Sequence, residues 1–406
     1  AEDVFSRLRA FAAYGFCKAH AASFGKIAYQ TAYLKAHYPA EFLTGILNNE
    51  PMGFYPPNVI IEEARRLGIG LLGVDINASE AKFTTEPIEV ADLGLQIANR
   101  GSAQSKIENL KSRIPSIRVG LNQVKNISEA EVQSILDARA EKPFSSFSDF
   151  CLRTKCDRPT IENLINCGAF DSFGHPRGKL MWLLGEVISA KSKISSQKSK
   201  MEGPSLIDGL TAQDLDNQIR NLPDGPELTL HERVRMDYDI LGLSTICHPM
   251  VFYREKLTKA RMKTAREIRE VADNTIVKVA GVVVVCMRPP TKSGTIVVFI
   301  TLEDETGFAD CVVFPKVYEK YGSVIYSNPA LIIEGKAQKM GKEIASKVKI
   351  EDPGTLLVAD DPFSDEGAID GLRVSLRKSW GVHAKGQGDD VLPVECAPAN
   401  KEESNE

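Results

Sequence analysis

The first strong pattern in the chain is helical and lies between residues 14 and 47. Apolar and aromatic side chains recur there at three- and four-residue spacing, at Phe16, Phe24, Ile27, Ala28, Ala32 and Leu34. This spacing predicts a helix, and Pro39 should end it because proline lacks the backbone N–H that would continue it. A second, shorter helix is expected over residues 40–47. Periodicity alone therefore favours a buried helical hairpin that packs on a larger body.

A further amphipathic helix is predicted to begin at Asn58, as N-cap, and to end at Gly68. It carries Arg65 and Arg66. The simplest interpretation is that both arginines face solvent, and the more specific hypothesis is that they contact a phosphate. A short strand is expected at residues 71–77. Residues 84–113 show no clear period, which indicates a variable connection.

Residues 114–190 are predicted to be helical and to contain a helix-hairpin-helix centred on Val124–Ser128. Such a hairpin usually has a Gly-hydrophobic-Gly turn, whose backbone N–H groups bind a DNA phosphate. Asn126 and Ser128 replace the two glycines here. Asparagine tolerates a left-handed φ and serine caps helices, so the hairpin geometry should survive. A DNA-contacting hairpin and a purely structural one both remain open.

A second hairpin is expected shortly afterwards, opened by Gly168 and closed by Gly174, with Arg177 and Lys179 entering the next helix. Two copies make a nucleic-acid role more plausible than one copy would. The residues proposed to contact DNA from the two hairpins are Lys125, Asn126, Ser128, Arg177 and Lys179.

Residues 191–229 are rich in Lys, Ser, Gln and Asp and predict a mobile linker. A connecting helix is then predicted over His231–Leu241. His248 stands in a His-Pro-Met turn and is interpreted as a structural residue.

From residue 275 to residue 352 the period of the apolar positions changes from 3.6 to 2. Three predicted strands, a helix and two further strands follow the order of an oligonucleotide-binding (OB) β-barrel, here expected to be five-stranded. Ile296, Val298, Ile300 and Leu302 should point inward, so Phe299 should point outward. An outward Phe is a surface on which a base stacks, or it reflects β-propensity alone. Arg288 and Lys292 lie on the loop beside it. The acidic turn Glu303–Glu305 is interpreted as a solvated hairpin turn.

The composition limits the number of domains and the class of protein, but it does not identify a chemical activity. The 406 residues are enough for two to four domains, and 43% are hydrophobic and 26% charged, as in ordinary globular proteins. The net charge of −4 does not favour a nucleic-acid binder, so any basic surface must be local. The eight cysteines form no CxxC pair, so no zinc site is expected and a reduced, cytoplasmic location is the default. We expect no membrane span, because no apolar run reaches the length of one.

Three stretches resemble one protein family closely. The first stretch is YGFCKAHAASF and the second is AYQTAYLKAHYPAEFL. The third is NNEPMGFY, which ends at Tyr55. Together they resemble the fingers region of bacterial C-family DNA polymerases, the family of the DNA polymerase III alpha subunit. The PMGFY run is typical of the error-prone, ImuC-type translesion branch. Cys17, where the replicative subunits commonly have Asn, also favours that branch.

The resemblance implies a multidomain α+β organisation. It consists of the end of the fingers (residues 1–95), tandem helix-hairpin-helix (114–190), linker and connecting helix (191–270), OB domain (275–355) and a mostly disordered tail (356–406). It also implies that basic residues of the fingers hold the triphosphate of the incoming deoxynucleotide, with Lys18, His20 and Lys26 as candidates. DNA, and further replication or mutagenesis proteins, are the implied partners.

Polymerisation needs paired carboxylates that hold two Mg²⁺ ions, and no Asp-x-Asp pair stands on a predicted strand. In the family these aspartates precede the fingers. We therefore expect no catalytic or metal-binding residue in this chain, with Mg²⁺ bound elsewhere in a longer parent polymerase. The chain begins with Ala1 inside a helical pattern, which also indicates a fragment. The rival hypothesis is a stand-alone, non-catalytic adaptor built of helix-hairpin-helix and OB modules.

Overall fold

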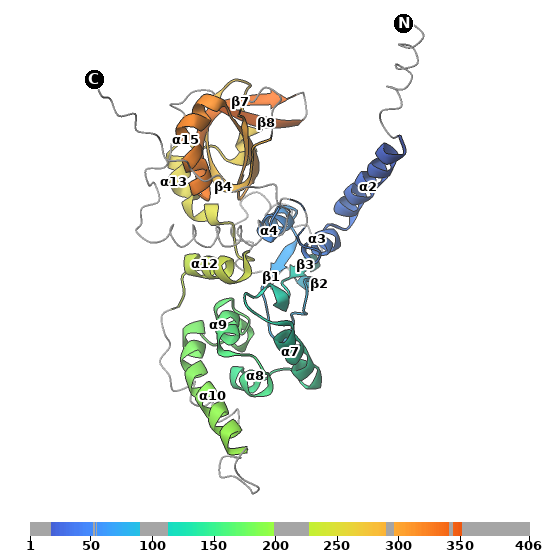
Figure 1. The fold of residues 1–406 in the computed structure, drawn as a ribbon, viewed down its shortest axis with the longest axis vertical. Coiled ribbons are helices and arrows are strands. Elements are labelled where there is room, and N and C mark those ends of the chain that lie inside the picture. Colours follow the sequence, from blue (N-terminus) through green and yellow to red (C-terminus); the bar gives the residue numbers. More distant parts are fainter. Residues whose placement is uncertain are drawn as a thin grey trace, which may run out of the picture.

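A computed structural model describes residues 18–51, 53, 55–89, 113–198, 227–289, 296–340 and 344–350. The start of the first motif before Lys18, the part of the expected linker between residues 199 and 226, and the expected tail lie outside these ranges. Figure 1 shows a β-barrel at one end, a mixed helical and β body below it, and one helix that projects from the side.

The projecting helix is α2 (Lys18–His37), and Pro39 follows it as the first residue of α3 (Pro39–Leu47). The predicted helix–Pro–helix order is confirmed, but the predicted burial of the pair is wrong for α2. Every residue from Ala19 to Tyr38 is exposed, whereas α3 buries Ala40, Leu43, Thr44 and Leu47. Tyr29 and Tyr33 lie on the side of α2 opposite Phe24, so this helix carries large side chains on both sides, since successive residues turn by about 100°.

After α3 come α4 (Pro57–Arg66) and a small sheet of β1 (Gly70–Leu72), β2 (Thr84–Glu89) and β3 (Arg113–Arg118). β3 lies in the centre, parallel to β1 and antiparallel to β2. Asn58 is not the N-cap of α4, because the proline pair starts the helix earlier, with Pro56 as N-cap and Pro57 as first residue. Gly68 follows the helix with a φ of +82°, as predicted for its end.

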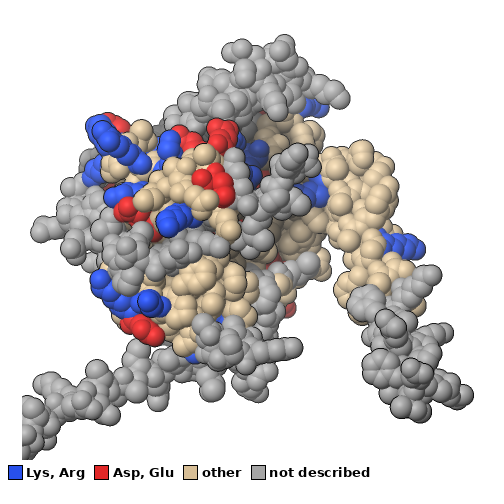
Figure 2. All heavy atoms as spheres, turned by 90° about the horizontal axis from the view of Figure 1, so that it is seen from above, with Lys and Arg blue, Asp and Glu red and all other residues tan. Residues whose placement is uncertain are grey.

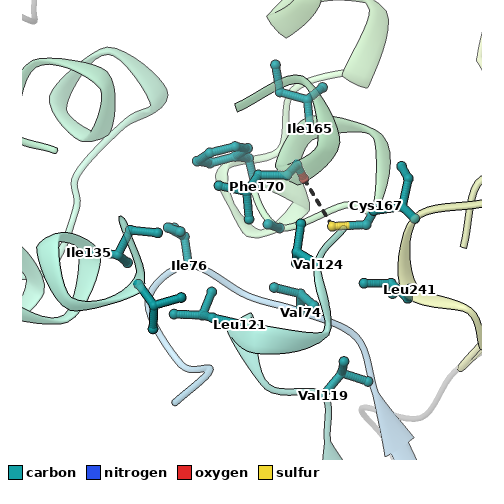
Figure 3. Close-up of a cluster of buried hydrophobic side chains, with 14 of the residues drawn as sticks. Val74, Ile76, Val119, Leu121, Val124, Ile135, Ile165, Cys167, Phe170 and Leu241 are labelled. Carbon is teal, nitrogen blue, oxygen red and sulfur yellow. Dashed lines mark hydrogen bonds between the residues drawn. The ribbon is translucent and has the colours of Figure 1, made fainter. Parts of the chain in front are cut away.

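The hairpin region consists of η2 (Leu121–Gln123), α7 (Glu129–Glu141), α8 (Phe147–Arg153), α9 (Arg158–Asn166), η3 (Asp171–Phe173) and α10 (Arg177–Lys198). Its apolar side chains share one core with α3 and with the residues around β1. Figure 3 shows Ile76, Leu121, Val124 and Phe170 converging in this core, with Leu241 from a later helix at its edge. The expected linker was wrong for residues 191–198, which continue α10.

Residues 230–268 form α12 (Leu230–Leu241), η4 (Pro249–Tyr253), α13 (Arg254–Lys259) and α14 (Ala265–Ile268). The predicted connecting helix is confirmed as α12. Its side chains Val234 and Tyr238 pack with Met250 of η4 against Val282 and Ile332 on the outside of the barrel. Because Ile240 and Leu241 at the end of α12 enter the other core, this segment joins the two bodies.

The barrel strands are β4 (Ile276–Met287), β5 (Val298–Asp304), β6 (Gly307–Val313), β7 (Ala330–Met340) and β8 (Ile344–Ile350), with α15 (Pro315–Ser327) between β6 and β7. They close in the order β4-β5-β6-β8-β7. The predicted order of strands and helix is therefore confirmed. The alternation predicted for β5 is confirmed as well, because Val298, Ile300 and Leu302 are buried in the barrel and Phe299 is only half-buried.

Candidate nucleic-acid interface

The turn of the first hairpin has the backbone geometry that its sequence predicts. Asn126 has a φ of +64°, in the left-handed region that asparagine tolerates. Ser128 is the N-cap of α7, and its backbone N–H donates to Glu131 Oε2 at 2.9 Å in a reciprocal capping box. Asparagine and serine thus reproduce the shape that two glycines usually provide.

Several N–H groups of this turn already have partners inside the chain. Lys125 donates its backbone N–H to the Ile240 carbonyl oxygen of α12 at 3.0 Å, and Ile127 donates to Val124. The Glu131 carboxylate also accepts from the Asp157 backbone N–H at 2.9 Å. A carboxylate therefore stands beside the turn at which a phosphate would bind.

The charge of Glu131 is retained. Partial burial opposes ionisation, but hydrogen bonds from the Asp157 backbone and from Ser128 lower the pKa of Glu131. A negative group at this position repels a phosphate, which favours the structural role of the hairpin. Our sequence reasoning missed Glu131, although the spacing Ser128-x-x-Glu131 is the signature of a capping box.

The second hairpin is closed by an internal ion pair. Arg177 donates from Nε and Nη2 to the two carboxylate oxygens of Asp171, at 3.0 and 2.7 Å, and from Nη1 to the Asn166 carbonyl oxygen at 2.6 Å. Its guanidinium lies against Gly168, where a Cβ would come within 2.2 Å of it. Lys179 is also buried. These two predicted DNA contacts thus lie within the folded hairpin and do not face solvent.

The two arginines of α4 are neither solvated nor placed for a phosphate, so both interpretations of them were wrong. Arg65 donates to the carbonyl oxygens of the segment after α12, at Ser244 (2.9 Å), Thr245 (3.2 Å) and Ile246 (2.9 Å). Arg66 reaches the barrel, where its Nη1 lies 2.9 Å from Glu303 Oε1 and its guanidinium 4.6 Å from the centroid of the Phe308 ring.

The acidic turn of the barrel is buried, which corrects the prediction of a solvated turn. Glu303 and Asp304 are 0% and 1% exposed. Arg254 of α13 pairs with Asp304 at 3.1 Å and also with Glu305. Burial raises the pKa of Glu303 to about 8, despite the opposing charge of Arg66. The acidic residues are therefore part of the contact between the barrel and the helices, which no local pattern reveals.

His248 is structural, as predicted. It is buried, and its Nδ1 accepts the backbone N–H of Met250 at 3.1 Å. Burial lowers the pKa of His248.

The strand face on which Phe299 was predicted to point outward is present at one end of the barrel. Phe299 on β5 is paired across the strands with Met287 of β4, which is 45% exposed. Arg288 is exposed, and its guanidinium lies 5.7 Å from the centroid of the Tyr318 ring of α15. Lys292 lies outside the described residues. Figure 2 shows basic and acidic side chains interspersed on the side of the barrel seen from above, without one continuous basic patch.

The three nucleotide-binding candidates lie on α2. His20 packs edge-on against Phe24, with ring centroids 4.6 Å apart, and Lys26 is exposed. Since each residue turns the helix by about 100°, Lys18 and Lys26 lie on neighbouring faces and His20 on the opposite side from Lys18. The three candidates therefore do not share one face of α2.

Among the described residues, no group of three or more His, Cys, Asp or Glu side chains is arranged to hold a metal ion. Within the same ranges, none of the helices combines the length and apolar character that crossing a membrane requires.

Two families match the chain. Residues 68–180 match a helix-hairpin-helix motif, and residues 277–350 match an OB-fold nucleic acid binding domain. The first match includes β1, β3, both hairpins and the start of α10, which agrees with their shared core. The α+β organisation predicted from the sequence, with helix-hairpin-helix followed by OB barrel, is confirmed.

Curated relatives are similar over most of the chain. An error-prone DNA polymerase of Symbiobacterium thermophilum is 36% identical over 86% of this chain and 33% of its own length. One of Anaeromyxobacter dehalogenans is 33% identical over 91% of this chain, and error-prone DNA polymerase 1 of Rhizobium meliloti is 30% identical over 96% of it. The chain spans about a third of the length of these relatives. The resemblance found in the fingers motifs is confirmed, because the chain is similar to bacterial error-prone DNA polymerases over about a third of their length.

Proposed function

We propose that this chain supplies the end of the fingers and the DNA-binding modules of an error-prone, DNA-directed DNA polymerase. Such an enzyme would act in translesion synthesis and in mutagenesis after DNA damage, in the cytoplasm. The observation that carries the proposal is the similarity to an error-prone DNA polymerase over 86% of the chain. The helix-hairpin-helix match and the OB-fold nucleic acid binding match support it independently.

The fingers helix, the barrel and the hairpin region would each contact a different part of the substrate. The basic side chains of α2 would contact the triphosphate of the incoming deoxynucleotide through charge-assisted hydrogen bonds. The exposed end of the barrel face, with Arg288 and Phe299, would contact the single-stranded template by stacking. The hairpin region would hold the body rigid and contact the duplex backbone where N–H groups remain accessible. Mg²⁺ and the catalytic carboxylates would be supplied by the rest of the parent polymerase.

A chimeric enzyme tests the proposal. The matching third of the Symbiobacterium thermophilum error-prone DNA polymerase would be replaced by this chain, and primer extension measured on undamaged templates and on templates with an abasic site. We expect extension on both, with the natural polymerase as the positive control. A folded chimera that extends neither template, together with a chain that still binds primer–template DNA, would favour the adaptor hypothesis.

The first hairpin can be tested separately by duplex-DNA anisotropy with the full chain. Asn126→Gly keeps the left-handed φ and should preserve or strengthen binding, whereas Asn126→Pro fixes φ near −65° and should weaken it. Glu131→Gln removes the carboxylate beside the turn and should strengthen binding if a phosphate approaches there. Equal affinity of all three variants would leave the hairpin a structural element.

A further inference from the structure

Part of the outer face of the barrel is covered by the chain itself. Val59 of α4 packs on Val284 and Val285 of β4, in a small cluster that Phe308 of β6 also contacts. Phe308 further lies beside the Tyr55 ring, at 6.5 Å between centroids. The surface of β4, β5 and β6 near the turn at residues 303–308 is thus occupied by α4 and cannot receive a strand of DNA.

The opposite end of the same face remains open. Met287 is 45% exposed and pairs across the strands with Phe299, and Arg288 follows it with an exposed guanidinium. This guanidinium lies over the Tyr318 ring of α15, so the open end of the strands continues onto a helix.

The helix α15 presents an aromatic ledge, which we define as Tyr318, Gly322 and Tyr326. The three residues are spaced by four and therefore share one face of the helix. The Tyr318 ring lies over Gly322, where a Cβ would come within 3.2 Å of it. It meets the Tyr326 ring edge-on, at 6.5 Å and an interplanar angle of 88°. Glycine between the two tyrosines leaves the space that lets the rings meet.

Tyr326 is held in place and yet half of its surface is open. It is 52% exposed. Its hydroxyl interacts with the thiol of Cys286 at the end of β4. An oriented, exposed ring beside a guanidinium is suited to stacking a nucleobase while the cation attracts the phosphate backbone.

We propose that single-stranded DNA leaves the strand face at Met287 and Phe299 and stacks on the aromatic ledge of α15, with Arg288 between the two surfaces. The proposal rests on the proposed function and deepens it by naming the path of the template strand. It differs from binding along the whole strand face, which α4 prevents. The preference for DNA over a protein follows from the exposed guanidinium and from the OB-fold nucleic acid binding match, which includes every residue of the path.

The test uses the full chain and a labelled dT oligonucleotide of about 12 nucleotides at about 50 mM salt. We expect Tyr326→Ala and Arg288→Ala each to weaken binding by about five- to tenfold. Tyr326→Phe should bind like the natural chain, because stacking needs the ring and not the hydroxyl. Matched controls are Ile276→Ala and Lys336→Ala, which alter exposed residues at the opposite end of β4 and on its partner strand.

A bromodeoxyuridine-substituted oligonucleotide, crosslinked by ultraviolet light, gives a second readout that binding elsewhere in the chain does not mask. We expect crosslinked peptides from α15. If Tyr326→Ala still binds the oligonucleotide and the crosslinks are confined to other segments, the proposed binding at the aromatic ledge is wrong. The proposed function is not affected by that result. A folded chain that binds no oligonucleotide at all would count against both.

Discussion

The helices α2 and α4 follow closely in the chain and place their basic residues in opposite environments. On α2, Lys26 stands on a helix exposed from Ala19 onward, and Figure 1 shows this helix reaching away from the body. On α4, Arg65 and Arg66 are largely buried and fixed by carbonyl oxygens and carboxylates. Lys26 of α2 is exposed to a ligand, whereas the arginines of α4 hold the fold.

A cation therefore becomes structural when its neighbours exclude water and provide hydrogen-bond acceptors. Arginine suits this role because its planar guanidinium donates hydrogen bonds to several acceptors at once. Arg65 uses it on three successive carbonyl oxygens. The two helices meet at Lys35 and Glu63, whose 2.8 Å ion pair is 46% exposed on the lysine side. Variants of the two helices test this contrast.

The largest effect is expected for Arg66→Ala. At about pH 9, above the pKa of Glu303, the substitution leaves the buried Glu303 carboxylate without its cation and should lower the free energy of unfolding by about 3–5 kcal/mol, measured with denaturant. Lys35→Ala is the control and should cost less than about 1 kcal/mol, because its ion pair is exposed. Combining Arg66→Met with Glu303→Leu should recover much of the loss. If Arg66→Ala and Lys35→Ala lower the free energy of unfolding by the same amount, the contrast between buried and exposed cations is wrong.

A pH effect is expected at Asp237 of α12, which is 4% exposed and accepts from Ser244 Oγ at 2.8 Å. Burial raises the pKa of Asp237 from 3.8 to about 7, so the folded protein holds a proton that the unfolded chain releases. Its contribution to stability is therefore present below about pH 4 and is lost as pH rises to about 7.

Asp237→Asn removes this titration and keeps an acceptor for Ser244. Relative to the natural chain, the variant should become more stable between about pH 4 and 7, by on the order of a few kcal/mol. Unfolding free energies of both proteins at several pH values measure this difference. A difference that does not change with pH would show that Asp237 is ionised in the folded protein throughout.

A smaller effect is expected for Arg65→Lys. Lysine keeps the charge, but its single ammonium cannot reach three carbonyl oxygens, so about 2 kcal/mol of unfolding free energy should be lost. Arg113→Lys on β3, where the arginine side chain is 66% exposed, is the matched control and should cost less than about 0.5 kcal/mol. An Arg65→Lys variant as stable as the control would mean that charge alone suffices.

The smallest change in stability is expected on α2. Tyr29→Ala removes a side chain that is 72% exposed and should alter the unfolding free energy by less than about 0.5 kcal/mol. Lys26→Ala should be equally neutral for stability, yet raise the KM for nucleotide in the chimeric polymerase. A stability loss of several kcal/mol from either variant would show that α2 is buried against the body.

Local rules of the chain predicted most of the elements. Asn126 at a left-handed φ, Ser128 as a helix N-cap, and Gly168 and Gly174 at positive φ follow from what those residues tolerate within a few positions. The order of strands and helix in the barrel followed from the period of its apolar residues. The similarity to error-prone DNA polymerases was predicted from residue motifs at the fingers.

The candidate site was predicted less well. Arg177 was expected at DNA and instead closes its own hairpin on Asp171, six positions away. Glu131 and Tyr326 were missed, although a capping-box spacing and the Tyr318-Gly322-Tyr326 spacing were visible in the sequence. Each residue type permits more than one role, and the choice depends on which groups the fold brings beside it.

Most of the secondary structure, the hairpin turns, the barrel order and the similarity to error-prone DNA polymerases could be predicted from the sequence. These depend on backbone preferences and apolar periods that act over a few residues. The exposure of α2, the pairing of Arg66 with Glu303 and the covering of part of the barrel face by α4 became visible in the folded chain. Those contacts join residues far apart in the chain, and burial and dielectric environment exist only once the chain has folded.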